Sequence, residues 1–375
     1  MLTFVSSVSA VVSEAVGASQ AAGVPQVGLM QPPPGLENHN RSDAPPCVDG
    51  RLLDKANTRP DVRVMVLLAE PRTGSSLMSS LIAESADVLP LFELFNNLAH
   101  LNVFDSSLHE TVTMWLRQDL AREDSPPLTT DELTNAIGDR PMDAVDSAIR
   151  LAQVRGQHWL SFKTFGNNCL GHFRPAMLRL AARSDVSMVH LRRNMFQSLT
   201  SEAKIKAGCE QYVGGNQTVA SSCKVPIDIR ELPDIFSDEV RRSACHMTLM
   251  EAAGGARRST VVYHDLDVAP TMTAKHELAV RKCQQAANPH TFCASKPQKW
   301  RTADIYGTAQ DAVKELSKKV SNYEQVRGFV ASQKRSLCRE AFHSAEWTDT
   351  IGGSEEELQK LTAWCVANPD FDVLD

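Results

Sequence analysis

The sequence predicts an α/β fold of three layers, in which helices cover both faces of a central parallel sheet. Short apolar runs rich in β-branched residues occur at 62–68, 159–163, 187–192 and 260–263, and a parallel strand buried on both faces has this composition. Apolar residues at helical spacing follow these runs, which indicates a helix after each strand. With 375 residues, of which 42% are hydrophobic and 22% charged, the chain is long enough to bury such a core.

Composition divides the chain into three parts. Residues 1–58 are rich in small residues and contain Pro32-Pro33-Pro34-Gly35, so we expect a flexible tail, with an atypical targeting peptide as the alternative. Residues 59–340 hold the predicted strands and form the α/β domain, and residues 341–375 form an acidic extension. No stretch approaches about 18 uninterrupted apolar residues. We therefore expect no transmembrane segment and a cytoplasmic protein.

Charge is distributed unevenly along the chain. Residues 1–149 carry 9 basic and 20 acidic side chains, residues 150–345 carry 29 and 17, and residues 346–375 carry 1 and 8. Acidic flanks would repel the backbone of a nucleic acid, so the basic middle is better suited to binding one compact anion. The alternative is that the basic side chains lie on solvated helix faces.

The nine cysteines show neither a Cys-x-x-Cys pair nor a His spacing typical of zinc, so we expect no structural metal. Their odd number and wide scatter fit reduced thiols. In an oxidising compartment, three pairs are close enough in sequence to form disulfides: Cys209/Cys223, Cys283/Cys293 and Cys338/Cys365.

The first predicted strand leads into a candidate phosphate-binding loop. The strand 62–68 is followed by Pro71-Arg72-Thr73-Gly74-Ser75-Ser76, and Leu77 and Leu81 then recur at helical spacing. At a strand–loop–helix junction, backbone N–H groups, hydroxyls and the helix N-terminus converge on an anion. This predicts a P-loop-like fold. The Lys of a Walker-type loop is absent, so a standard ATPase or kinase loop does not fit.

A second strand-to-helix junction lies about 120 residues further along. The strand 187–192 leads to Arg193, and Ser201 falls on a helix that can end at Gly208. An Arg at a strand end and a Ser one or two turns into the next helix can meet if the chain turns between them. A guanidinium fork and a hydroxyl suit a second phosphate group.

Together the two junctions resemble a known family. Pro71 to Leu77 resembles the 5′-phosphosulfate loop of sulfotransferases that use 3′-phosphoadenylyl sulfate (PAPS), and Arg193-Asn194 with Ser201 resembles their 3′-phosphate motif. Val261 to Leu266 resembles the Tyr-Glu-Asp-Leu strand of these enzymes, with His264 in place of Glu. Ser321 to Val326 resembles a late segment of the bacterial trehalose and nodulation sulfotransferases. The resemblance spans about residues 62–330, and makes 59–340 a sulfotransferase domain.

The resemblance implies which residues hold PAPS. Arg72, Thr73, Gly74, Ser75 and Ser76 would bind the phosphosulfate, and Arg193 with Ser201 the 3′-phosphate. The Arg-Lys-Gly loop that closes over the donor in cytosolic relatives is missing. Its role would fall to Lys296 or Lys299, and Trp300 would stack on the adenine.

Cytosolic steroid and phenol sulfotransferases carry a loop Lys and a catalytic His shortly after a Lys in the next strand. Here Arg72 stands in the loop, and no His follows Lys163. Glu93 is a carboxylate among apolar neighbours just after the first helix, and glycan-type and trehalose-type enzymes have a catalytic Glu in the corresponding place. We therefore expect Glu93 to be the general base. The alternative is an acid on the exposed edge of an apolar segment; His100 and His172 would then be the next candidates.

The expected activity is transfer of a sulfuryl group from PAPS to a hydroxyl or amine of a small metabolite or sugar, without a metal. Arg72 and Lys163 would neutralise the charge that grows on the bridging oxygen, although Lys163 can also be read as a surface lysine at a strand end. Two other interpretations stay open: a P-loop-type nucleotide-binding kinase, and a non-catalytic relative of the fold.

Overall fold

The structure of the protein, a computed structural model, describes residues 61–83, 85, 87–95, 106–122, 125–213, 216–219, 223–269, 271–288, 290, 292, 315–344, 347 and 353–374. Contacts divide the chain into residues 1–44 and 45–375, and every described residue belongs to the second unit. The predicted tail, 1–58, therefore lies outside the described residues. The domain boundaries drawn from the sequence stay predictions.

The central sheet contains β1 (Arg63–Ala69), β2 (Val88–Phe92), β3 (Trp159–Phe165), β4 (Val186–Arg192) and β7 (Arg258–Val262), and a separate hairpin contains β5 (Glu210–Val213) and β6 (Asn216–Val219). The helices before β7 are α1 (Ser75–Ala83), α2 (Ser106–Asp119), α3 (Thr130–Asp139), α4 (Pro141–Val154), α5 (Gly166–Leu170), α6 (Arg174–Ala182), α7 (Met195–Lys206), α8 (Leu232–Ala253) and the 3₁₀ segment η2 (Gly255–Arg257). Those after β7 are α9 (Tyr263–Val268), α10 (Met272–Ala287), α12 (Leu316–Lys319), α13 (Tyr323–Phe342), α15 (Glu355–Ala367) and the 3₁₀ segment η3 (Pro369–Phe371).

The five strands of the central sheet are parallel and run in the order β2-β3-β1-β4-β7. Ala69 at the end of β1 pairs with Phe165 at the end of β3, and Leu68 pairs with His190 of β4. Because parallel strands end at the same edge of a sheet, the loops after β1, β3 and β4 open beside one another. The predicted α/β class with a central parallel sheet is confirmed.

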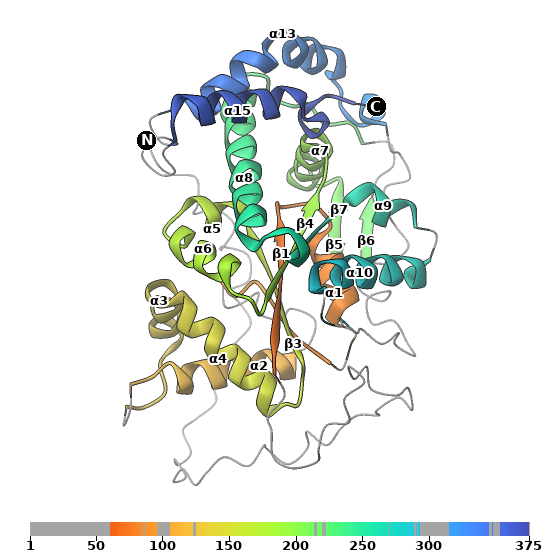
Figure 1. Cartoon of the computed structure of the whole chain (residues 1–375). Helices are drawn as coiled ribbons and strands as arrows, with labels where there is room; N and C mark the ends of the chain where they lie inside the picture. The colour runs from red at the N-terminus through yellow and green to blue at the C-terminus, as the bar shows by residue number, and fades with distance from the viewer. Residues whose placement is uncertain are drawn as a thin grey trace. The chain divides into compact units, whose positions relative to one another are not determined.

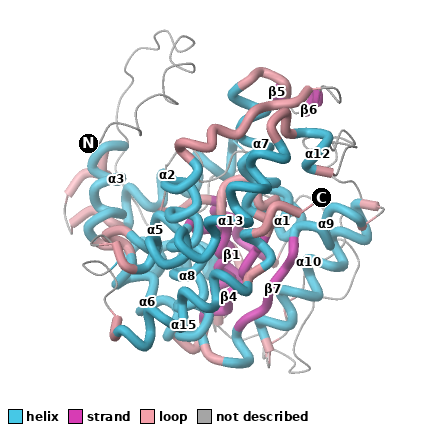
Figure 2. The backbone as a smooth tube through the Cα atoms, turned by 90° about the horizontal axis from the view of Figure 1, so that it is seen from above, coloured by secondary structure: helices cyan, strands magenta, loops and turns pink. Residues whose placement is uncertain are grey.

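The two faces of β1 belong to different apolar clusters, which explains why its sequence is a continuous apolar run. Val64, Val66 and Leu68 pack with α2, α4 and α6, whereas Met65 and Leu67 pack with α1 and α10. Figure 2 shows helices on both sides of the strands. The sheet is therefore the middle of three layers.

A further apolar cluster joins α8 to α13 and α15. Its members include Phe236, Val330, Leu358 and Phe371, all of them buried. In Figure 1 α13 and α15 lie beyond the end of the sheet where α7 begins, and α8 extends from the sheet to reach them. The residues around η3 are thereby held beside the edge of the sheet at which β4 ends. α13 ends at Phe342, close to the start that the sequence predicted for the acidic extension.

One strand was not predicted, and one local prediction was wrong. The segment after α1 contains an additional strand, β2, at the edge of the sheet. Its five residues are all buried and include Pro90, which an edge strand tolerates. Tyr263 to Leu266, expected to continue a strand, instead forms the start of α9. By contrast, α7 ends as predicted, with Gly208 at a φ of 71° just beyond it.

Among the described cysteines three pairs are disulfide-bonded, so of the two states that the sequence left open the structure has the oxidised one. Cys209–Cys223 and Cys338–Cys365 are two of the pairs that sequence spacing suggested. Cys169–Cys245 joins α5 to α8 across 76 residues, a separation that sequence spacing alone does not connect. Cys283 is a buried free thiol, and its suggested partner Cys293 lies outside the described residues.

Within the described ranges, no helix has both the length and the apolar character required to cross a bilayer.

Candidate active site

The loop between β1 and α1 has an unusual backbone. Arg72 and Gly74 have φ values of 65° and 78°, in the left-handed region. The Thr73 amide and hydroxyl both donate to the carbonyl of Glu70, at 3.3 and 2.7 Å. The loop thus turns sharply before α1 begins at Ser75. The first backbone N–H groups of a helix have no acceptor within the helix, so they are available to a ligand.

Gly74 also allows a close packing contact. A Cβ atom at this position would lie 2.5 Å from Cδ2 of Tyr263, the first residue of α9. The aromatic ring therefore covers the loop backbone. The same ring lies 4.2 Å from the Arg193 guanidinium carbon, a cation–π arrangement. Tyr263 is a site residue that the sequence did not assign, although it begins the Tyr-His-Asp-Leu segment quoted for the resemblance.

Arg72 joins the two predicted phosphate motifs. Its Nε and a terminal nitrogen donate to Ser201 Oγ at 3.1 and 3.0 Å. Arg193 in turn donates to the Arg72 carbonyl at 2.5 Å. Arg193 and Ser201, expected to meet each other, both contact the intervening Arg72. Three donor-bearing side chains, Arg72 after β1, Arg193 after β4 and Ser201 on α7, are therefore gathered at one place.

Glu93 and Lys163 form a second group on the other side of β1. Lys163 Nζ lies 2.8 Å from Glu93 Oε1 and donates to Ser76 Oγ at 3.0 Å. Both side chains are buried, with 11% of the Glu93 and 5% of the Lys163 side chain exposed. The alternative interpretations, an exposed acid and a surface lysine, were wrong. Ser76 is the second residue of α1, directly after the loop, so its hydrogen bond with Lys163 connects β3 to the loop.

Several predicted residues fall elsewhere. Lys296, Lys299, Trp300 and His100 lie outside the described residues. His172 is exposed, and its ring lies 3.9 Å from that of Phe173.

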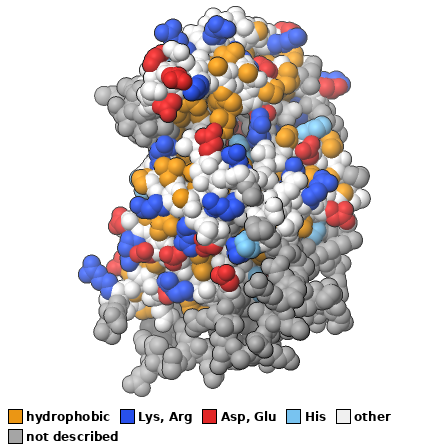
Figure 3. All heavy atoms as spheres, in the orientation of Figure 1, with side chains coloured by type: hydrophobic (Ala, Val, Ile, Leu, Met, Phe, Trp, Pro, Cys, Tyr) orange, Lys and Arg blue, Asp and Glu red, His pale blue; other side chains and the backbone are white. Residues whose placement is uncertain are grey.

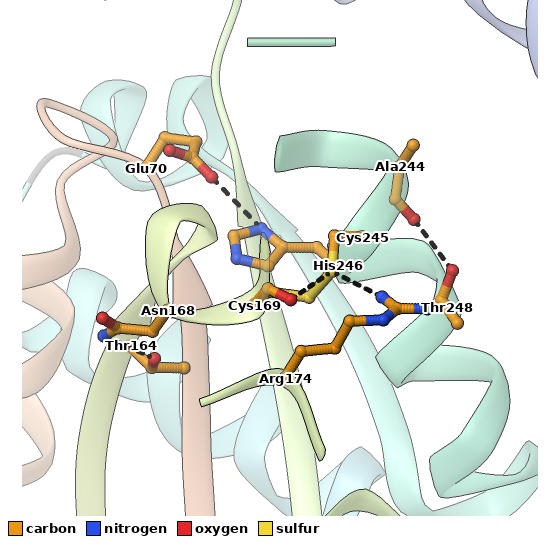
Figure 4. Close-up of a disulfide and its surroundings, with 9 residues drawn as sticks. All are labelled: Glu70, Thr164, Asn168, Cys169, Arg174, Ala244, Cys245, His246 and Thr248. Carbon is orange, nitrogen blue, oxygen red and sulfur yellow. Dashed lines mark hydrogen bonds and ion pairs between the residues drawn. A yellow bond between two sulfur atoms is a disulfide. The ribbon is translucent and has the colours of Figure 1, made fainter. Parts of the chain in front are cut away.

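A buried polar cluster behind the loop was not predicted. Arg242 Nε lies 3.1 Å from Glu70 Oε2, and His246 Nδ1 lies 3.5 Å from Glu70 Oε1. The rings of His190 and His246 are 5.2 Å apart. Figure 4 shows the Glu70 carboxylate pointing at His246, beside the Cys169–Cys245 disulfide. The only signal in the sequence was a charged residue, Glu70, at the end of an otherwise apolar strand.

Burial controls the charge of this cluster. It raises the pKa of Glu70 well above its usual value, and the nearby Glu239 carboxylate raises it further, while Arg242 opposes both effects. Burial lowers the pKa of His190 to about 3 and that of His246 well below its usual value. Both histidines are therefore neutral near pH 7. Because the Glu70 carbonyl accepts both Thr73 bonds, the cluster also supports the loop from behind.

Charged side chains are interspersed on the surface. On the face drawn in Figure 3, Lys and Arg side chains alternate with Asp and Glu side chains. This mixture differs from the continuous basic stripe that usually marks nucleic-acid binding. Among the described residues, no group of three or more His, Cys, Asp or Glu side chains is arranged to hold a metal ion.

No family model and no curated protein matches the chain. Among the solved structures that are similar to it are two sulfotransferase domains. One is the sulfotransferase domain from the Synechococcus PCC 7002 olefin synthase, with 12% identity and a TM-score of 0.38, covering 84% of this chain and 98% of that one. The other is the sulfotransferase domain from the curacin biosynthetic pathway, with 11% identity and a TM-score of 0.36, covering 82% and 98%. Since both TM-scores are below 0.5, the function proposed below depends on the site geometry and the sequence motifs.

Proposed function

We propose that the protein is a sulfotransferase that moves a sulfuryl group from PAPS to a hydroxyl or amine of a small metabolite or sugar. The observation that carries this proposal is the contact of Arg72 with both Ser201 and Arg193. It joins a phosphate-binding type of loop to a second anion motif 121 residues away. Two neighbouring anion sites suit a donor with a phosphosulfate at one end of its ribose and a phosphate at the other.

The charge of the site supports the same donor. PAPS carries about four negative charges by the usual ionisation of phosphate groups. Arg72, Arg193 and Lys163 supply three cations, and the first amides of α1 supply further donors. Gly74 has no side chain, and this absence lets the Tyr263 ring pack directly over the loop.

The proposed chemistry uses the second group of residues. Glu93 accepts the proton of the acceptor hydroxyl or amine, whose oxygen or nitrogen attacks the sulfur. The bond from sulfur to the bridging oxygen breaks, and adenosine 3′,5′-bisphosphate leaves. Lys163 and Arg72 neutralise the charge that develops on the bridging oxygen. The 2.8 Å contact between Lys163 and Glu93 supports this division of roles, because it keeps the base next to the loop.

Ligand-induced stabilisation separates this proposal from its alternatives. A sulfotransferase should gain thermal stability with adenosine 3′,5′-bisphosphate and none with ATP and Mg²⁺, and a P-loop-type kinase should show the reverse. A non-catalytic relative would respond to neither. A mass-spectrometric screen for the gain of one sulfate, with PAPS and a panel of alcohols, amines and sugars, then identifies the acceptor. Absence of stabilisation by the bisphosphate would contradict the proposal.

The compartment is part of the same proposal. Cytoplasm was the expectation from the sequence, but three disulfides support an oxidising compartment instead.

A further inference from the structure

The segment from Asn368 to Asp372, which contains η3, is packed firmly beside the donor motif. Phe371 is 1% exposed. Its ring centre lies 5.7 Å from that of Phe236 on α8 and 5.7 Å from that of Trp364 on α15. We call residues 368–372 the clamp segment.

The clamp segment contacts both chain neighbours of Arg193. Arg192 Nε donates to Asp370 Oδ2 at 2.7 Å, and a terminal nitrogen of Arg192 donates to Asn368 Oδ1 at 3.0 Å. Asn194 Nδ2 donates to the carbonyl of Asp372 at 2.8 Å and to that of Pro369 at 3.3 Å. The residue between these two anchors is the one proposed to bind the 3′-phosphate.

Asn194 transmits this contact to α7. While its amide nitrogen donates to the clamp segment, its Oδ1 accepts from the amides of Phe196 and Gln197 at 3.0 and 3.3 Å. This is an N-cap, which fixes where the helix begins. The clamp segment therefore fixes the orientation of the capping amide, and with it the turn from β4 into the helix that carries Ser201.

The clamp segment is itself anchored to α13. Lys334 Nζ donates to Asp372 Oδ1 at 2.6 Å and to the Asn368 carbonyl at 3.0 Å. The Cys338–Cys365 disulfide joins α13 to α15 just before the segment. The segment is thus held by α13 as well as by Arg192 of β4.

The clamp segment also forms one wall of a cavity of about 420 Å³. Asp370 and Phe371 line this cavity together with Thr73 and Arg193. The donor loop, the 3′-phosphate motif and the clamp segment therefore share one hollow, so a displacement of the segment would change the surroundings of Arg193.

We propose that Asp370 and Asn368 are positioning residues of the donor site. They hold Arg192 while the carbonyls of the clamp segment hold Asn194, and this sets the direction of Arg193 toward the donor 3′-phosphate. The inference rests on the proposed function. It predicts that recognition of the 3′-phosphate depends on Asn368 and Asp370, which are 176 and 178 residues away from Arg192 in the sequence.

The test compares Asp370→Ala with the parent by calorimetry. The measured quantity is the ratio of affinities for adenosine 3′,5′-bisphosphate and adenosine 5′-phosphate, which a general loss of stability does not change. We expect this ratio to fall about tenfold in Asp370→Ala, comparable to loss of a charge-assisted hydrogen bond. Asp370→Asn, which keeps an acceptor for Arg192, should restore part of it.

The matched control is Glu356→Ala, which removes an exposed carboxylate of α15 that pairs with Lys360. An unchanged ratio in Asp370→Ala overturns the inference.

Two further measurements keep the test decisive. If Asp370→Ala does not fold, Arg192→Gln breaks the same contact from the sheet side and should lower the same ratio. If the parent binds neither nucleotide, the proposed function is wrong, and the clamp is tested without ligand by hydrogen exchange. The amides of Phe196 and Gln197 should then exchange faster in Asp370→Ala than in Glu356→Ala. Equal exchange rates would overturn the inference independently of the proposed function.

Discussion

Arg72 and Phe92 are the two non-glycine residues of the described ranges with positive φ, at 65° and 53°. Such backbone geometry costs of order 1–3 kcal/mol and persists only where surrounding contacts enforce it. Arg72 is the residue that joins the two anion motifs, and Phe92 directly precedes Glu93. Backbone strain therefore occurs in both groups of the candidate site, that of Arg72 and that of Glu93. Such strain is typical of functional sites, where it holds side chains in a fixed orientation.

Glu93→Gln tests the general base. The substitution keeps the shape of the side chain and removes its basicity, so we expect turnover to fall roughly 10²- to 10⁴-fold while donor binding changes little. The free energy of unfolding should also fall, by about 1–3 kcal/mol, because buried Lys163 loses its carboxylate partner. Steady-state kinetics and chemical unfolding measure the two effects, with Glu277→Gln on the exposed face of α10 as the control. More than about a tenth of the parental turnover in the variant, well above the expected range, would refute the assignment.

Arg193→Ala tests recognition of the 3′-phosphate. Loss of one charge-assisted hydrogen bond should weaken binding of adenosine 3′,5′-bisphosphate by about 1.5–3 kcal/mol and leave adenosine 5′-phosphate nearly unaffected. Calorimetry with both nucleotides measures the difference. Arg335→Ala, which removes an exposed guanidinium from α13, controls for net charge. If Arg193→Ala kept the parental ratio of the two affinities, Arg193 would not be reading the 3′ group.

Gly74→Ala tests the packing of Tyr263 over the loop. The new Cβ would lie 2.5 Å from the ring, at a φ of 78° that side chains rarely adopt. We expect the free energy of unfolding to drop by at least about 1 kcal/mol and donor binding to be lost. Tyr263→Ala in the same chain should recover part of the stability by removing the clash.

The matched control is Gly138→Ala, in helix α3, where a Cβ would meet nothing within 4 Å. It should be neutral or stabilise by about 0.5–1 kcal/mol, since alanine is the better helix former. Differential scanning calorimetry of both variants checks the contrast. Equal melting temperatures for Gly74→Ala and the parent would show that Tyr263 does not close over the loop in solution.

At the level of elements, β1, β3 and β4 were predictable because each is an apolar run buried on almost every residue. The edge strand β7 is mostly exposed or half-buried, and the sequence marked it only around its buried Val261. β2 was not predictable, because it is five residues long, contains Pro90 and precedes a charged residue. The strand-to-helix turns at Arg72 and Arg193 were also predictable, since each places polar residues between two apolar patterns. The contact between them depends on β1 and β4 being neighbours in the sheet, which a local pattern cannot specify.

The same reason explains what the sequence missed around the site. Glu70, Arg242 and His246 come from the end of β1 and the middle of α8, and they form a cluster only because α8 packs across the sheet. The ion pair of Lys163 with Glu93 depends on β2 pairing with β3. The clamp segment was interpreted as part of an acidic extension because its partner, Arg192, is 178 residues away from Asp370.

The disulfides can be checked directly. Peptide mapping without reduction should recover linked peptides for Cys169–Cys245, Cys209–Cys223 and Cys338–Cys365. Replacing both Cys338 and Cys365 by Ser should lower the free energy of unfolding by about 2–4 kcal/mol, because the unfolded chain regains freedom. Chemical unfolding of the variant and the parent under oxidising conditions measures this. Recovery of Cys338 and Cys365 as alkylated free thiols from the native protein would contradict the assignment.

At the scale of the whole molecule, the buried cluster links the two ends of the donor site. His190 lies near the end of β4, just before the clamp contacts, and Glu70 lies just before the loop. His246 on α8 is adjacent to both. Any loss of this packing would displace the loop after β1 and the turn after β4, the two candidate anion sites, together. The stability of the fold and the geometry of the site therefore share one group of residues, and their response to pH should reflect it.

The last prediction concerns that response. Burial, helped by the Arg192 charge, lowers the pKa of His190 from 6.5 to about 3, so folded His190 stays neutral over a range in which the unfolded chain takes up a proton. Between pH 6.5 and about 3 this histidine should therefore lower the free energy of unfolding by up to about 1.4 kcal/mol for each unit of pH decrease, and it should have no such effect above pH 7. In His190→Gln this dependence disappears. Glu70, whose raised pKa has the opposite effect, and His246 are present in both proteins, so the difference between parent and variant isolates His190.

Urea unfolding at pH 7.5, 6.0 and 5.0 measures that difference, with His343→Gln on the exposed end of α13 as the control. We expect the parent to lose stability relative to His190→Gln as the pH falls, and a constant difference across the three pH values would show that His190 is not held neutral in the folded protein.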